Sequence, residues 1–128
     1  MTQVGILLER LEALERSRIG HLSTITKWCN QLDESLKDFS NIVKVRTQQT
    51  NLNAAWEQYC ACCDKFADLL DTSCEKHQDV LSDRAAQQLR IQAYNERIEQ
   101  FVVSAAAFYD SQVLENVKLT NNPPPPNL

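Results

Sequence analysis

The sequence contains very little glycine and no dispersed proline. Only two of its 128 residues are glycine, and all four prolines are consecutive, at positions 123–126. Sheets and irregular folds need turn-forming residues spread along the chain. A chain of this length without them is more easily built from a few long helices. With 43% hydrophobic residues, the chain has enough apolar side chains to form one domain with a single core.

The sequence also lacks an excess of basic residues and any long hydrophobic run. It has 13 lysines and arginines against 17 aspartates and glutamates, a net charge of −4. This balance argues against binding nucleic acid through its phosphates and against docking on an anionic membrane. No apolar run approaches the roughly 20 residues of a membrane span, and the N-terminus shows neither a secretory core nor a myristoylation glycine. We therefore expect a cytoplasmic, intracellular protein with no membrane partner and no direct nucleic-acid partner.

The sequence does contain three stretches in which apolar residues recur at alternating steps of three and four. Such steps place side chains on one face of a helix. They predict helices over about 3–33, 40–71 and 78–115. Because short connections make neighbouring helices antiparallel, we expect an all-α fold, an elongated antiparallel three-helix bundle with coiled-coil-like packing. The bundle is expected over residues 1–118, followed by a proline-rich linker, 119–128, to a downstream region.

The predicted core follows the three apolar stripes. Its residues, which are also the candidates for assembly contacts, are Leu8, Leu11, Leu22, Ile25, Leu52, Trp56, Tyr59, Cys63, Phe66, Leu70, Ile91, Tyr94, Ile98, Phe101, Ala105 and Phe108. The first stripe is interrupted at Glu15 and Arg18, next to Gly20. We expect Gly20 to mark a bend or a close approach of another helix, and the interruption to mark a surface that is not simply core.

Residues that favour helix caps indicate the two boundaries. Asp33, Ser40 and Asn41 can each cap a helix, so the first boundary is placed there, with one continuous helix as the alternative. At the second boundary, the segment from Thr72 to Glu75 has the form of a capping box.

The cysteines suggest one candidate metal site. Cys60, Cys63, Cys74 and His77 have the spacing C-x2-C, ten residues, C-x2-H, and zinc favours such thiolate and imidazole ligands. The helical context opposes this site, because Cys63 lies on the apolar stripe and Cys74 lies beyond the predicted helix end. A redox pair of Cys60 and Cys63 would lack the helix N-terminus that activates such thiols. We therefore favour Cys63 as a core residue, and no metal or cofactor.

The five cysteines are also unlike a disulfide framework. Their number is odd, and three of them crowd into four positions, 60–63. This pattern favours reduced thiols in an intracellular protein. No catalytic constellation accompanies them, since the two histidines lie in different segments and no glycine-rich phosphate loop exists. We therefore expect no enzymatic activity.

Several short features occur along the chain in an order that resembles one known family. They are a basic-glycine element followed by Leu and Thr (Arg16, Arg18, Gly20, Leu22, Thr26), the run Asn-Gln-Leu-Asp-Glu-Ser at 30–35, Val45-Arg46 followed by Leu52, Trp56 and Tyr59, a mid-helix Tyr94, and the proline-rich spacer. This order resembles the N-terminal helical region of the Gag-like polyprotein of Bel/Pao long-terminal-repeat retrotransposons, or a domesticated derivative of it. The resemblance covers most of residues 5–128. The cysteine cluster departs from that family, and the nucleocapsid zinc-knuckle spacing is absent.

The resemblance implies a structural module that helps a polyprotein to self-associate, with no catalytic residues. Amphipathic helices without site chemistry indicate the same class, a protein whose partner is a second copy of itself or another helical protein. The alternative is a cellular scaffold or adaptor bundle, similar to a spectrin-type three-helix repeat. Only one unit is visible, whereas such repeats usually occur in arrays.

Overall fold

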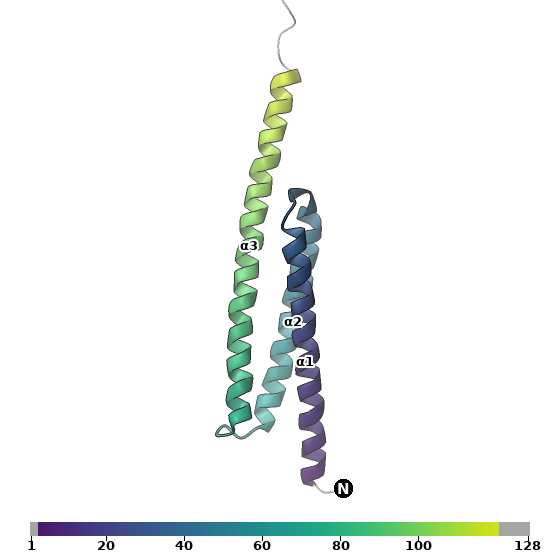
Figure 1. Ribbon diagram of the computed structural model, residues 1–128, viewed down its shortest axis with the longest axis vertical. Helices are drawn as coiled ribbons and strands as arrows, with labels where there is room; N and C mark the ends of the chain where they lie inside the picture. Colours follow the sequence, from purple (N-terminus) through teal and green to yellow (C-terminus); the bar gives the residue numbers. More distant parts are fainter. Residues whose placement is uncertain (1–2, 121–128) are drawn as a thin grey trace, which may run out of the picture.

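The computed structural model describes residues 3–120, with residues 118–120 described by their backbone only. The fold is an all-α bundle of three helices, and the described residues contain no strand. Helix α1 (Gln3–Ser35) is followed by a short 3-10 turn, η1 (Phe39–Asn41), then by α2 (Ile42–Leu69) and α3 (Glu75–Thr120). The helices run up, down and up along one long axis (Figure 1). The two ends of the bundle are called here the η1 end and the loop end, where residues 70–74 connect α2 to α3.

The first boundary is a true chain reversal, so the alternative of a continuous helix is wrong. The Asp38 side chain accepts a hydrogen bond from the backbone N–H of Ser40 (2.9 Å), which caps η1. The Asn41 side-chain amide donates to the carbonyl of Ser35 (3.1 Å) and ties the start of α2 to the end of α1. These two side-chain bonds fix the direction in which α2 returns along α1.

The second boundary differs from the expected one. Helix α3 begins at Glu75, about three residues early, so Glu75 is its first helical residue and not the third one of a capping box on Thr72. The loop is held instead by Asp71, whose carboxylate accepts from the N–H and the hydroxyl of Ser73, both at 2.9 Å. The hydrogen bonds of this Asx-type turn lower the pKa of the Asp71 carboxyl.

Helix α3 is also longer than its pattern predicted. It continues to Thr120, past the expected end near 115 and into the segment predicted as a linker from 119. No residue between 106 and 120 is glycine or proline, and the first proline stands at 123. The backbone therefore has no local reason to leave the helix until it approaches that proline. Residues 121–128, the rest of the predicted linker, lie outside the described part.

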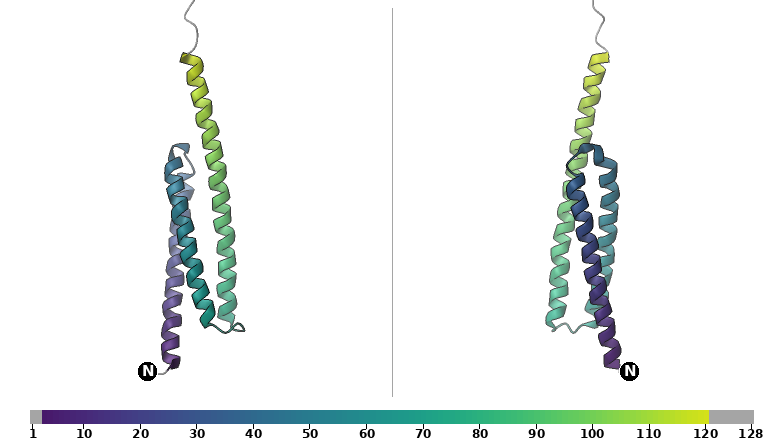
Figure 2. Two further views of the ribbon diagram at one scale, coloured as in Figure 1. Left: turned by 180° about the vertical axis from the view of Figure 1, so that it is seen from behind. Right: turned by 45° about the vertical axis from the view of Figure 1, so that its right-hand side comes forward.

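The core runs along the line where all three helices meet. Of the predicted core residues, those that are buried are Ile25, Leu52, Tyr59, Cys63, Phe66, Ile91, Ile98, Phe101 and Ala105. Those that are partly buried against them are Leu11, Leu22, Trp56, Leu70 and Tyr94. The backbone of α2 lies close to those of both other helices, whereas α3 lies closer to α2 than to α1. Figure 2 shows the same arrangement from two further directions.

Two residues predicted in the core, Leu8 and Phe108, lie on the surface instead, with 54% and 44% of their areas exposed. The apolar pattern continues at both positions, but the partner helices do not. Leu8 precedes the stretch of α1 that faces the end of α2, and Phe108 follows the last buried residue of α3. Phe108 is partly covered by the Phe39 ring of η1 and by the neighbouring Tyr109 ring, each with its centroid 5.3 Å away.

Candidate interaction surfaces

The four zinc candidates are distributed over three elements. Cys60 and Cys63 lie within α2, Cys74 lies in the loop, and His77 lies in the first turn of α3. Among residues 3–120, no group of three or more His, Cys, Asp or Glu side chains is placed to hold a metal ion. The helix continues past Cys63 to Leu69, as Phe66 and Leu69 require, and this separates the two halves of the motif.

Cys63 packs within the core beside Tyr59. It is 1% exposed, and burial raises the pKa of its thiol. Burial also raises the pKa of the Tyr59 phenol, which lies beside the Cys63 thiol and the Arg18 guanidinium. A thiol in this setting has little thiolate character, so it acts as a small apolar residue.

The interruption of the first stripe is a charge cluster built around one buried arginine, with partners that reach the surface. Arg18 is 5% exposed, although it is charged. Its guanidinium donates to both carboxylate oxygens of Glu15 (2.8 and 2.9 Å) and to Asp83 of α3 (3.0 Å). Lys76, also in α3, donates to the same Glu15 carboxylate (2.9 Å). The cluster therefore joins α1 to the beginning of α3.

The electrostatics of this cluster follow from its geometry. The hydrogen bond from Arg18, assisted by Lys76, lowers the pKa of Glu15 to about 2, and Glu15 and Asp83 raise that of Arg18. A buried guanidinium needs such partners, because an unpaired charge in the interior costs several kcal/mol, of order 3–5 when one partner is removed. We assign the cluster a structural role in docking α3.

Gly20, two residues further on, does not interrupt α1 and does not admit a close helix. Helix α1 is continuous through it, and a Cβ placed there would meet no atom within 4 Å. A close approach of another helix at this glycine is therefore excluded.

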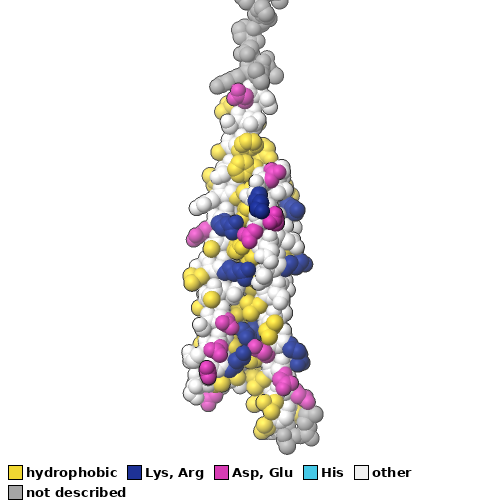
Figure 3. All heavy atoms as spheres, viewed as in Figure 1, with side chains coloured by type: hydrophobic (Ala, Val, Ile, Leu, Met, Phe, Trp, Pro, Cys, Tyr) yellow, Lys and Arg dark blue, Asp and Glu magenta, His cyan; other side chains and the backbone are white. Residues whose placement is uncertain are grey.

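The first exposed apolar surface is the projecting end of α3. We call residues 106–120 the α3 extension, since Ala105 is the last buried residue among the side chains of α3 that the structure describes, up to residue 117. Its apolar side chains include Tyr109, Val113 and Leu114, which are 41%, 59% and 61% exposed. The extension leaves the bundle at the η1 end and passes beyond α1 and α2 (Figure 1). Apolar side chains gather on α3 at and beyond that end (Figure 3).

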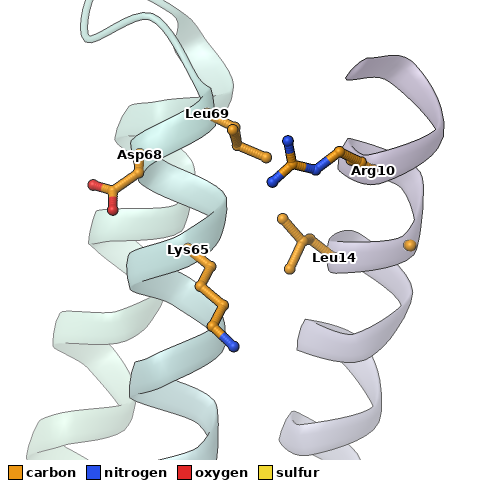
Figure 4. A pocket seen from close by; sticks show the side chains of 6 residues that line it. Arg10, Leu14, Lys65, Asp68 and Leu69 are labelled. Carbon is orange, nitrogen blue, oxygen red and sulfur yellow. The ribbon is translucent and has the colours of Figure 1, made fainter. Parts of the chain in front are cut away.

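The second surface is a groove between α1 and α2 near the loop end. It has a volume of about 380 Å³ and is lined by Arg10, Ala13 and Leu14 of α1 and by Lys65, Asp68 and Leu69 of α2. Figure 4 shows Leu14 and Leu69 pointing into the gap, Arg10 reaching from α1 towards α2, and Asp68 directed away. We call it the α1–α2 groove.

Neither surface was identified from the sequence. Arg10 and Lys65 look there like ordinary solvated charges, and only the fold shows that they flank one apolar floor. The extension did leave a signal, because Val102, Ala106, Tyr109, Val113 and Val117 recur at steps of four, three, four and four. That stripe overlaps the core stripe and was masked by it.

Comparison of this chain with models of protein families, with curated proteins and with solved structures finds no match. Within residues 3–120, none of the helices has the length and apolar character needed to cross a membrane.

Proposed function

We propose that this chain is a non-enzymatic structural module of Gag type that assembles through helix–helix self-association. The observation that carries the proposal is the α3 extension. An α-helix rises 1.5 Å per residue, so the extension adds roughly 20 Å of helix beyond the core. Isolated helices of this length are marginal in water, and an exposed apolar face gives such a helix a reason to pack against another.

The chemistry of the extension supports a helical protein partner and not a nucleic acid. Residues 106–120 carry two carboxylates, Asp110 and Glu115, and one basic residue, Lys118, a net charge of −1. A surface of this sign repels phosphates. The apolar residues recur at helical spacing, which is the form of an amphipathic helix that docks by its apolar face.

Light scattering over a concentration series tests the proposal. The wild-type mass is expected to rise above that of one chain, and Val113→Glu, which places a charge on the exposed stripe, is expected to lower the association constant at least tenfold. Ser111→Glu adds the same charge off the stripe and serves as the matched control. A wild-type chain that stays monomeric at every concentration would overturn the proposal.

The alternative function is a scaffold or adaptor bundle that binds a different protein. The same projecting helix favours it, because a helix that leaves a bundle without a break can hold a neighbouring unit at a fixed orientation. This alternative requires a monomer in solution. A monomeric chain that binds a helical partner, with Val113→Glu abolishing that binding, would favour it over self-association.

A further inference from the structure

The α3 extension and the α1–α2 groove lie at opposite ends of the bundle. The extension leaves the η1 end, whereas the groove lies between residues 10–14 of α1 and 65–69 of α2, near the loop end (Figures 1 and 4). The bundle itself separates them, so the extension cannot reach the groove of its own chain. Two copies placed head to tail bring one extension beside the other copy's groove.

The exposed face of the extension carries one charge among its apolar residues. Asp110 lies three residues before Val113, four before Leu114 and one turn after Ala106, and residues at these spacings are neighbours on one helix face. Asp110 has no ion-pair partner among the described residues. A carboxylate in the middle of an apolar face disfavours a purely apolar partner and favours one with a cation in the matching place.

The α1–α2 groove provides the complementary pattern. Its floor is apolar, formed by Ala13, Leu14 and Leu69, and two cations flank it, Arg10 from α1 and Lys65 from α2. The carboxylate of Asp68 also lines the groove but is directed away from the gap (Figure 4). Neither cation makes an ion pair within the described chain. One acidic group facing two basic groups across an apolar contact is electrostatic complementarity, which sets register and orientation.

The lengths also agree. A second hollow continues the groove along the same two helices as far as His21 of α1 and Gln58 of α2, and it shares Leu14 and Lys65 with the first. From Arg10 to His21, α1 rises about 17 Å, and the α3 extension, residues 106–120, rises about 21 Å, so it is long enough to span both hollows. Within the described chain both hollows are lined by α1 and α2 alone, so α3 leaves this side of the pair open.

We propose that the α3 extension of one copy lies in the α1–α2 groove of a second copy, with Asp110 between Arg10 and Lys65. The proposal rests on the self-association proposed above and names its two surfaces. The docked helix adds a fourth helix to the partner's bundle. The contact is heterologous, because it joins two different surfaces. In a pair, one copy keeps a free groove and the other a free extension, so further copies can add unless the assembly closes into a ring.

Two variants that each disable one surface provide the test. Val113→Glu disables the extension and leaves the groove intact. The double substitution Arg10→Glu with Lys65→Glu disables the groove and leaves the extension intact. All three positions are exposed, so circular dichroism and thermal melting are expected to match the wild type. Each variant alone is expected to be monomeric, and an equal mixture is expected to form a heterodimer whose mass stops at two chains.

A charge exchange checks the register independently. Asp110→Lys added to the groove double variant places a cation between two carboxylates, and this triple variant is expected to recover at least tenfold of the lost association. Ala13→Gln, which fills the floor without changing charge, is expected to weaken assembly as the groove double variant does.

The outcomes separate this inference from the proposed function. If the groove double variant and Ala13→Gln both assemble as well as the wild type does, the head-to-tail contact is wrong and the proposal of self-association stands. A mixture that forms no heterodimer while Val113→Glu alone is monomeric indicates a symmetric contact between two extensions, and also overturns it. A monomeric wild type overturns both proposals.

Discussion

The two halves of the bundle use different side chains to pack the three helices together. Near the η1 end, the Phe39 ring packs against Phe101 and Phe108, with centroids 5.5 and 5.3 Å apart, over a core that includes Ile98. Near the loop end, the buried position on α1 is held by Arg18, whose charge is balanced from two helices. The stripe on α1 has a similar spacing in both halves. Near the loop end Tyr59, Phe66 and Val80 are buried as well, so the two halves differ at the α1 position that Arg18 occupies; we call them the apolar half and the ionic half.

The difference shows that helical spacing identifies buried positions more reliably than residue type does. An apolar contact is non-directional and tolerates small shifts, whereas the Arg18 cluster requires Glu15 and Asp83 in one geometry. We therefore expect the Arg18 cluster to define how α3 begins, and the buried apolar side chains to supply most of the stability. The following substitutions test that division, beginning with the largest expected effect.

Ile98→Ala should be the most damaging change, because Ile98 is fully buried in the apolar half. Removing a buried aliphatic side chain without collapse of the cavity lowers the free energy of unfolding by about 2–5 kcal/mol. Leu89→Ala, on the same helix but 68% exposed, is the control and should change it by less than about 0.5 kcal/mol. Urea denaturation measures both. Similar losses at the two sites would contradict the assigned core.

In the ionic half, removing a partner should cost more than removing the charge. Glu15→Gln leaves Arg18 buried with Asp83 alone, and we expect a loss of about 2–3 kcal/mol. Arg18→Met replaces the buried charge with an apolar chain of similar length and should change stability by about 1 kcal/mol or less, in either direction. Denaturation of both variants at pH 7 decides the point. If Arg18→Met lowers the free energy of unfolding more than Glu15→Gln does, the cluster is a net source of stability.

The same cluster predicts a dependence on acid. The pKa of Glu15 is lowered from 4.5 to about 2 in the folded chain, so the folded state binds this proton more weakly than the unfolded state. Its contribution is therefore complete above pH 4.5 and is lost as the pH falls towards 2. The stability difference between wild type and Glu15→Gln should shrink over that interval in denaturation series at successive pH values. A constant difference from pH 7 to pH 2.5 would contradict the role of Glu15.

The sequence allowed the helices to be predicted because almost nothing in it interrupts them. The core assignments that follow from spacing are accurate where three helices overlap, as at Ile25, Tyr59 and Ile98. Spacing alone cannot show where a partner helix ends, so Leu8 and Phe108 were misplaced. It also cannot show that Asp83, 65 residues from Arg18, meets it, since such contacts depend on the register of α3 against α1. The α1–α2 groove, formed by side chains of two helices, was not predictable for the same reason.

Gly20→Ala should have the smallest effect, and it is the one change expected to stabilise the chain. Gly20 lies in the interior of α1, two residues from the charge cluster, and a Cβ there meets no atom within 4 Å. Glycine in a helix interior costs roughly 0.5–1 kcal/mol relative to alanine, because the unfolded chain loses more freedom on folding. The free energy of unfolding, measured by urea denaturation, should therefore rise by that amount, and the gain should add to the effect of Ile98→Ala in the distant half. A loss of stability would mean that α1 needs the conformational freedom of this glycine.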